Sequence, residues 1–215
     1  MESPILKISV WIIEILSWVL LLLSLLFCFK RGAPAYMKTF PLYTAVNCIP
    51  EIACFVWPNL SALVIFIFTL FELAYFTYFL SQIIQSKRTI RNLCVTNAIV
   101  GVVTIIELFT EPLRKVNGRL DLAESFILVT AALCYFRELF RAPKYIDLLK
   151  NSAFWMATGI LFYFVLLVPT VIFTSYFYYY GNKVTGQAIY SLNSYSQIIS
   201  YALYVKAMTC RQKLS

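Results

Sequence analysis

Seven runs of mostly apolar residues dominate this sequence of 215 residues. A hydrocarbon core about 30 Å thick takes roughly 20 residues of α-helix to cross. The runs cover residues 5–29, 39–57, 60–84, 93–109, 120–140, 153–178 and 188–207. The connections between them are short and carry turn-forming residues, among them the Asn117-Gly118 pair, so none can hold a separate domain. The pattern predicts an all-α fold: one transmembrane domain over residues 1–215, built as a polytopic bundle of seven helices.

The run at 120–140 is the weakest of the seven. Its clean apolar core covers only Ser125–Phe136, with Asp121 and Glu124 before it and Arg137 after it. Charged residues are costly inside a membrane, so these three are expected at its borders, and the two acids enter from the outer side. If this run does not span the membrane, six helices remain.

Composition and charge exclude a soluble domain and a nucleic-acid-binding protein. Hydrophobic residues make up 61% of the chain and charged residues 13%, whereas soluble domains average about 45–50% and about 25%. The net charge of +8 comes from Lys and Arg that flank the apolar runs, as the positive-inside rule describes. Thirteen of the 18 follow the first, third, fifth or last run. We therefore expect an outside N-terminus and a cytoplasmic C-terminus in the inner (plasma) membrane.

Several kinds of chemistry are missing from the chain. It contains no histidine, which is the commonest general base and metal ligand. Its six cysteines form no C-x-x-C motif, and five of them lie in apolar runs, as small packing residues do. We predict no metal site, no cofactor and no catalytic residue, and we do not expect an enzyme.

Four glutamates lie inside apolar runs, where a charged side chain costs about 2.5–3.5 kcal/mol on insertion scales. They are Glu14, Glu51, Glu72 and Glu107, one on each of the first four predicted helices. With the N-terminus outside, three of them fall in the outer half of the membrane and Glu72 lies near the midplane. Asn47 lies one helical turn before Glu51, on the same face.

The last run carries a continuous polar stripe. Tyr190, Asn193, Gln197, Ser200 and Tyr204 recur at spacings of three and four residues, so they share one face of a helix. Amide groups that face lipid would have no hydrogen-bond partners. We therefore expect this stripe to face the interior of the bundle.

Two interpretations of the buried polar groups stay open. In the first, they are protonated carboxyls and amides that hydrogen-bond between helices and hold them together. In the second, they line an outward-facing cavity that binds a small polar or cationic ligand. The candidate ligand-binding residues are Glu14, Glu51, Glu72, Asn47, Asn193, Gln197 and Tyr190. Four acids on four neighbouring helices are more than helix–helix adhesion usually needs.

Pro169 interrupts the sixth run near its middle. A proline there bends a helix, and the bend is either a static kink or a hinge. We single out Pro169 as the candidate hinge of a conformational change.

A motif in the last third of the chain carries a family resemblance. It consists of Ser152, Phe154-Trp155, Gly159, Leu161 and Tyr163, followed by Pro169 and the polar last helix. This stretch resembles a group of small bacterial seven-helix membrane proteins that are often encoded beside sensor kinases. The resemblance implies a sensory role and no catalytic residue.

Two functions follow from these features. The first is a membrane sensor that binds a small molecule in its outer cavity and contacts a cytoplasmic signalling partner, or anionic lipid, through its basic face. The second is a small secondary transporter or proton-coupled carrier with Glu72 as its protonatable site. In both, the expected surroundings are the lipid bilayer, and no nucleic acid partner is expected.

Overall fold

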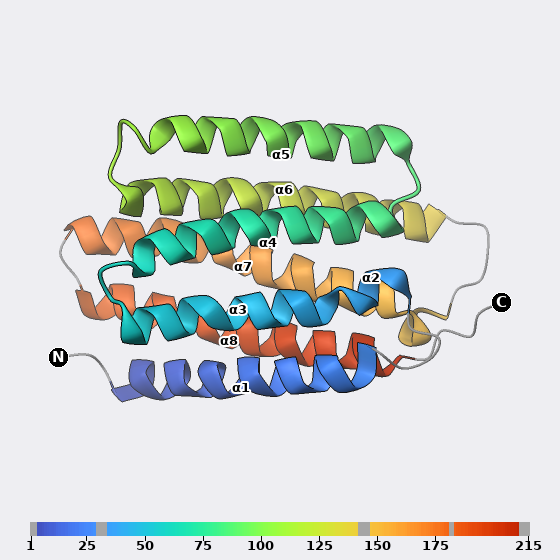
Figure 1. Ribbon diagram of the computed structural model, residues 1–215, viewed down its shortest axis with the longest axis horizontal. Coiled ribbons are helices and arrows are strands. Elements are labelled where there is room, and N and C mark those ends of the chain that lie inside the picture. The colour runs from blue at the N-terminus through green and yellow to red at the C-terminus, as the bar shows by residue number, and fades with distance from the viewer. Residues whose placement is uncertain (1–3, 29–33, 142–146, 181–182, 211–215) are drawn as a thin grey trace.

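Long helices run through nearly the whole chain in the computed structural model (Figure 1). The structure describes residues 4–28, 34–141, 147–180 and 183–210. Its elements are α1 (Pro4–Cys28), α2 (Ala35–Lys38), α3 (Phe40–Val56), α4 (Ser61–Ile83), α5 (Lys87–Glu107), α6 (Leu113–Arg141), the 3-10 turn η1 (Leu148–Lys150), α7 (Ser152–Tyr180) and α8 (Lys183–Thr209). In these ranges there are seven long helices and no strand. The predicted all-α bundle is confirmed.

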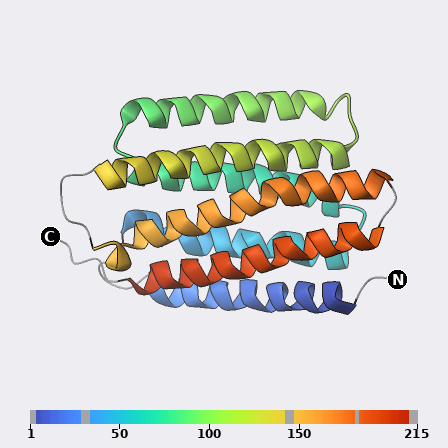
Figure 2. The same cartoon turned by 180° about the vertical axis from the view of Figure 1, so that it is seen from behind.

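Six of the long helices form a closed ring. α1 packs against α3, α3 against α4, α4 against α6, α6 against α7, α7 against α8, and α8 against α1. Figures 1 and 2 show α3 and α4 on one side and α6, α7 and α8 on the other, with α1 along one edge. Because the helices alternate in direction, α1 begins at one end of the bundle and α8 ends at the other (Figure 1). We call these the N-terminal end and the C-terminal end.

α5 lies outside the ring, along the edge opposite α1, and packs on α4 and α6 (Figure 1). Most of its apolar side chains are exposed, among them Ile99 and Val102. Asn97 in α5 donates a hydrogen bond to Thr77 of α4. α5 is therefore the helix with the least protein around it, and its apolar face is suited to lipid.

Within the described residues, four helical segments are long and apolar enough to cross a membrane. They are Ala35–Val56, Ser61–Ile83, Lys87–Glu107 and Ser152–Thr174. Large apolar side chains also cover the outside of the bundle, such as Phe55 at 82% exposed and Phe109 at 86%. Exposed apolar surface on this scale would drive a soluble protein to aggregate. The chain is a membrane protein.

Two predicted helix starts are wrong by six or seven residues. α5 begins at Lys87 rather than residue 93, because Ser86 caps it by accepting a hydrogen bond from the Thr89 backbone N–H at 3.3 Å. α6 begins at Leu113 rather than residue 120, so Asn117-Gly118 is helical and not a turn. The Asn117 side chain donates to the Ala62 carbonyl of α4 at 3.0 Å. A tertiary contact thus overrides the local turn preference.

α6 shows that the fifth predicted run is one continuous helix. It has 29 residues, which at 1.5 Å per residue span about 43 Å. That length exceeds the thickness of a hydrocarbon core, but α6 is not among the four segments that are also apolar enough to cross. That it crosses the membrane stays a prediction, with six spans as the alternative.

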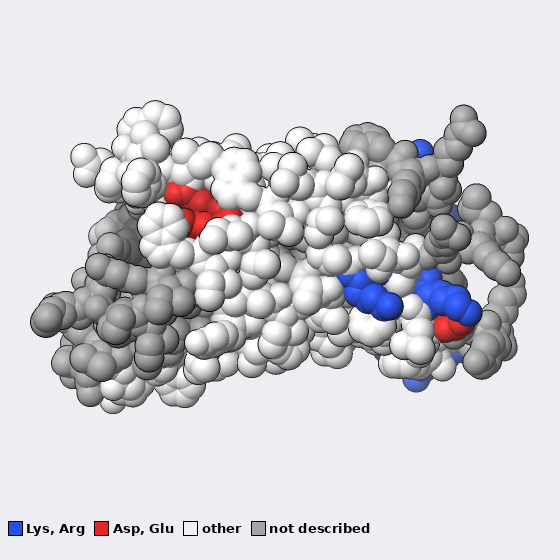
Figure 3. Space-filling model, turned by 90° about the horizontal axis from the view of Figure 1, so that it is seen from below, with Lys and Arg blue, Asp and Glu red and all other residues white. Residues whose placement is uncertain are grey.

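Exposed basic side chains gather at the C-terminal end. They are Lys38, Lys87, Arg88, Arg91, Arg137, Arg141, Lys150 and Lys206. In Figure 3, the visible Lys and Arg atoms lie toward this end, and the larger acidic patch lies toward the other. At the N-terminal end, Arg119 pairs with Glu107 at 3.0 Å and Lys115 pairs with Glu111 at 3.3 Å. The side of the membrane that each end faces stays a prediction.

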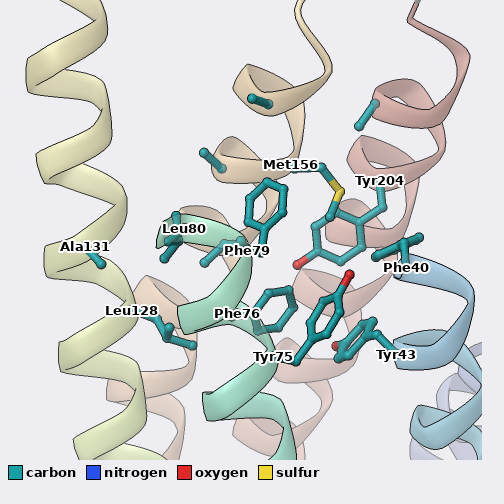
Figure 4. Close-up of a cluster of buried hydrophobic side chains, with 14 of the residues drawn as sticks. Phe40, Tyr43, Tyr75, Phe76, Phe79, Leu80, Leu128, Ala131, Met156 and Tyr204 are labelled. Carbon is teal, nitrogen blue, oxygen red and sulfur yellow. The ribbon is translucent and has the colours of Figure 1, made fainter. Parts of the chain in front are cut away.

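The ring interior divides into two halves along the bundle axis. Toward the C-terminal end, most of the fully buried side chains are apolar, and we call this the apolar half: Phe40, Phe76, Phe79, Leu80, Leu128 and Met156 (Figure 4), together with Ile160. The Ser24–Thr44 hydrogen bond is a buried polar contact within it. Toward the N-terminal end, the polar half contains Ser17, Glu51, Thr69, Asp121, Glu124, Ser125 and Ser196. The boundary between the two halves lies near Glu72 of α4.

Candidate functional site

A cavity of about 50 Å³ lies at this boundary, between α3, α4, α7 and α8. Its walls are Tyr43, Asn47, Phe68, Glu72, Tyr163, Gln197, Ser200, Tyr201 and Tyr204; we call it the Glu72 cavity. One water molecule needs roughly 10–15 Å³ on this measure, and pockets for drug-sized ligands begin at about 300 Å³. The Glu72 cavity therefore has room for a few waters, a small ion or a molecule of a few heavy atoms.

Glu72 is the acid of this cavity. It is only 8% exposed, and its carboxyl oxygen accepts a hydrogen bond from the Tyr43 hydroxyl at 2.6 Å. The Tyr43 ring stacks on Tyr75 with ring centroids 4.8 Å apart. Stacking on Tyr75 fixes the position of the Tyr43 ring, and the hydrogen bond from the Tyr43 hydroxyl fixes the position of the Glu72 carboxyl. Figure 4 shows the two rings side by side. In the part of the chain that the structure describes, no Lys or Arg forms an ion pair with Glu72.

Tyr201 organises the opposite wall. Its hydroxyl oxygen accepts hydrogen bonds from the Asn47 amide at 2.9 Å and the Gln197 amide at 2.8 Å. Both amide NH₂ groups point to the phenol, so their carbonyl oxygens and the phenolic O–H are left for a bound species. Ser200 donates to the Gly159 carbonyl at 3.2 Å and links α8 to α7.

Gly159 lets α7 and α8 approach closely beside the cavity. A Cβ at this position would lie 2.5 Å from Cε1 of Tyr204. Tyr204 is 2% exposed, and its ring also meets Phe40 edge-to-face with centroids 5.6 Å apart. A glycine is therefore required where the α8 tyrosine crosses the α7 backbone.

The structure brings together three of the predicted ligand-binding residues. Glu72, Asn47 and Gln197 all line the Glu72 cavity. The predicted inward face of the last helix is in place as well, since Ser200 and Tyr204 line the cavity with Gln197. The ligand-binding role of these residues stays a prediction.

The other predicted site residues do not line this cavity. Glu51 accepts a hydrogen bond from Ser17 at 2.7 Å, between α3 and α1. The same hydroxyl donates to the Glu14 backbone carbonyl at 2.9 Å, and the Glu14 side chain is half-buried. Asn193 is half-buried one turn before Gln197. The Tyr190 side chain lies outside the described part of the structure.

Pro169 lies inside α7 and is exposed, and the helix continues through it from Ser152 to Tyr180. The next residue, Thr170, donates its hydroxyl to the Leu166 carbonyl at 2.8 Å. Pro169 therefore faces away from the ring interior, and its role as a hinge stays a prediction.

Sequence reasoning missed the aromatic wall of the cavity. Tyr43 lies four residues before Asn47, and Tyr201 lies four residues after Gln197. This spacing places each tyrosine on the same face as a predicted polar residue. That signal was available, but a tyrosine in an apolar run also fits simple packing, so spacing alone did not separate the two roles.

Sequence reasoning also misplaced two acids. Asp121 and Glu124 were expected at the outer border of the fifth helix, but α6 begins seven residues earlier than predicted. Asp121 is the ninth residue of α6, about 12 Å along the helix from its start. Glu124 is 1% exposed. Both carboxyls lie in the polar half of the ring interior and not at its border.

No metal-binding arrangement occurs within the described ranges, where no three His, Cys, Asp or Glu side chains lie together in a way that could hold an ion. Cys48, Cys54, Cys94, Cys134 and Cys210 are free cysteines. The candidate site therefore consists of one carboxyl, two amides, one serine hydroxyl and four phenols, with Phe68 as its apolar wall.

The fold and the site define a helical membrane protein with a small, acceptor-rich cavity at the centre of its bundle. Comparison of the chain with known protein families, with curated proteins and with solved structures gives no match. The cavity and its surroundings are therefore the features of the molecule that bear on its function.

Proposed function

We propose that this protein is a multi-pass sensor of the inner (plasma) membrane that binds a small cation in the Glu72 cavity. The observation that carries the proposal is the composition of the cavity wall. A carboxyl, two amide carbonyls and several phenols surround a space of about 50 Å³ that no basic side chain lines. Acceptor groups of this kind suit a cation with N–H donors, and the volume suits ammonium or methylammonium.

The uneven distribution of polar side chains along the bundle axis supports a sensor over a conduit. Polar side chains continue from the cavity toward the N-terminal end, which the charge pattern predicts to be outside. Toward the C-terminal end, the apolar half closes the interior with Phe40, Phe76 and Met156, each at most 1% exposed. A transporter would have to open this packed layer in every cycle. A sensor needs only to shift the helices that surround the ligand.

α8 supplies a route for the signal. It contributes Gln197, Ser200, Tyr201 and Tyr204 to the cavity wall and continues to the C-terminal end. There, the Cys210 thiol and the Trp155 indole N–H both donate to the Leu149 carbonyl, at 3.4 Å and 3.0 Å. A movement of α8 in response to a ligand would change this contact between the end of α8 and the start of α7.

The exposed basic residues near that contact provide a surface for a cytoplasmic signalling partner. Lys206 and Arg141 are exposed there, and Lys150 lies 2.8 Å from Asp147. The lysine holds the pKa of the Asp147 carboxyl below its ordinary value by donating a hydrogen bond to it.

The alternative is a proton-coupled carrier that uses Glu72. The observation in its favour is that no described Lys or Arg pairs with the Glu72 carboxyl, so a proton is an available counter-charge. In this alternative, the apolar half of the ring would have to open during transport.

Thermal unfolding of the purified full chain in nanodiscs tests the sensor. Ammonium, methylammonium and potassium chlorides are compared at equal ionic strength. A cation that binds the folded state raises the melting temperature as its concentration rises. We expect a rise with ammonium or methylammonium, its loss in Glu72→Gln, and its retention in Glu111→Gln, which removes an ion-paired acid at the end of the bundle. The absence of any cation-specific shift would contradict the proposal.

Proteoliposomes loaded with a pH-sensitive dye separate the sensor from the carrier. A sensor produces no proton or methylammonium flux above that of empty liposomes. A flux that Glu72→Gln abolishes and Glu111→Gln preserves would establish the carrier instead.

A further inference from the structure

Three carboxyl groups lie on the packed helices α4 and α6, beside the Glu72 cavity. Thr69 and Glu72 lie three residues apart on α4, and Asp121 and Glu124 lie three residues apart on α6, so each pair shares a face. The Thr69 hydroxyl lies 3.4 Å from the Asp121 carboxyl and 3.1 Å from the Ile65 carbonyl of its own helix, and it donates to both, so Thr69 and Asp121 lie at the same level. α4 and α6 run in the same direction (Figure 1), so Glu72 and Glu124, each three residues further on, lie one level beyond this contact on the two packed helices. We call these three residues the carboxyl trio.

The three members differ in their hydrogen bonds. Glu72 accepts from Tyr43, and Asp121 accepts from Thr69. Glu124 is 1% exposed, and its Oε1 has no hydrogen-bond partner among the described residues. A buried acceptor without a donor costs about 1–3 kcal/mol, and more when it carries a charge. Glu124 is therefore the member on which a negative charge is least supported.

The titratable groups around the carboxyl trio are tyrosines. Tyr163 of α7 lines the cavity and lies within interaction range of all three carboxyls. Tyr43 of α3 and Tyr201 and Tyr204 of α8 lie within range of Glu72. The described ion pairs of the chain all lie at the ends of the bundle. Three adjacent carboxyls without a cation cannot all be ionised in a membrane interior.

We propose that the carboxyl trio is a proton-binding site, in which Glu124 keeps its proton and Glu72 exchanges its proton for the cation that enters the cavity. Glu72 is the member that ionises because the Tyr43 hydroxyl supports its carboxylate. In the exchange, the O–H bond of Glu72 breaks, the proton leaves to water through the polar half, and the carboxylate takes the cation. One positive charge enters and one leaves, so the buried charge does not change. The exchange deepens the proposed function and rests on it, whereas the proton on Glu124 does not.

Infrared spectroscopy of the full chain in nanodiscs tests the proton on Glu124. The carbonyl stretch of a protonated carboxyl is separate from the bands of a carboxylate. At neutral pH without added cation, we expect a protonated-carboxyl band that Glu124→Gln weakens, leaving the contribution of Glu72, and that Glu111→Gln preserves. A wild-type spectrum without this band, or a band that Glu124→Gln leaves unchanged, would overturn the assignment.

A pH-sensitive dye in weak buffer tests the exchange when ammonium or methylammonium is added. We expect one proton released per cation bound, and an apparent Kd that rises about tenfold for each pH unit below the midpoint of release. Asp121→Asn removes a like charge near Glu72, so the midpoint of release should move to lower pH. Cation binding without proton release, or an Asp121→Asn midpoint equal to that of the wild type, would overturn the exchange.

The two measurements separate failure of the inference from failure of the proposed function. A protonated Glu124 without binding of either cation would reject the sensor and leave the proton site standing. Cation binding that Glu72→Gln abolishes but that releases no proton would keep the sensor and reject the exchange. If Glu124→Gln does not give a monodisperse helical protein, Glu124→Asp takes its place, because it keeps the acid and is expected to shift the band.

Discussion

The two halves of the ring interior are built from the same helices, but apolar packing joins the helices in one half and hydrogen bonds join them in the other. In the apolar half, Phe76 meets the rings of Tyr43, Phe164 and Tyr204 at centroid distances of 4.9, 5.9 and 6.4 Å. In the polar half, single hydrogen bonds such as Ser17 to Glu51 join helices. Dense packing leaves no room for a second species, whereas a polar interior with an unsatisfied acceptor can take one. The comparison predicts that stability is concentrated in the apolar half, while the proposed binding site lies where the two halves meet.

The largest loss of stability should follow Phe76→Ala in the apolar half. Phe to Ala changes in packed cores cost about 3–5 kcal/mol, part of which is the cavity left behind. In lipid, the cavity and the lost contacts remain as costs, so we expect about 3 kcal/mol. Unfolding of the purified protein with increasing dodecyl sulfate measures the change. Phe126→Ala, at a residue 61% exposed, is the control, and an equal loss in both variants would contradict the contrast between the two halves.

Gly159→Ala should be the next most damaging change. Its Cβ would lie 2.5 Å from Tyr204 Cε1, and such overpacking costs about 1–3 kcal/mol. Gly101→Ala and Gly118→Ala have no heavy atom within 4 Å of the new Cβ, and alanine favours a helix by up to about 1 kcal/mol. The same unfolding assay should therefore show a loss of stability for Gly159→Ala and a gain for Gly101→Ala and Gly118→Ala. A neutral Gly159→Ala would show that Tyr204 can move aside at no cost.

Tyr201→Phe should have a moderate effect, at the border between the halves. It removes the acceptor of two amide hydrogen bonds, from Asn47 and Gln197. Interhelical hydrogen bonds in membranes average about 0.6 kcal/mol each, so the expected loss is about 1 kcal/mol. Tyr195→Phe, at a tyrosine 50% exposed, is the matched control. A loss no greater than that of the control would mean that water replaces the phenol.

Glu124→Leu should give the smallest change, and in the opposite direction. The substitution removes a buried acceptor without a partner, so we expect the protein to gain a few tenths of a kcal/mol up to about 1 kcal/mol. Glu51→Leu, in the same half, removes the acceptor of Ser17 and should lose stability. The two variants are compared by unfolding in dodecyl sulfate. A clear loss in Glu124→Leu would show that Glu124 has a structural partner and would weaken the case for a proton site.

The sequence predicted the helices well and their polar contacts only in part. Asn47 and Gln197 were expected to face the interior because an amide in lipid lacks partners, and both do. Glu51 was expected in the same cavity as Glu72, but it lies one turn beyond Asn47 and bonds to α1. The spacing of residues along a helix predicts which side of the helix each one occupies. It does not predict which neighbouring helix packs against that side.

The hydropathy pattern by itself determined that this chain is a bundle of seven long helices with the apolar character of a membrane protein, because every backbone N–H and C=O in hydrocarbon must be bonded within its own helix. The order of the helices in space was decided only by the tertiary structure. α5 lies outside the ring and lets α4 meet α6, which brings Glu72 to Asp121 and Glu124. Which helices pack together depends on how the side chains of whole helix faces fit one another, and the periodicity within a single helix does not contain that information.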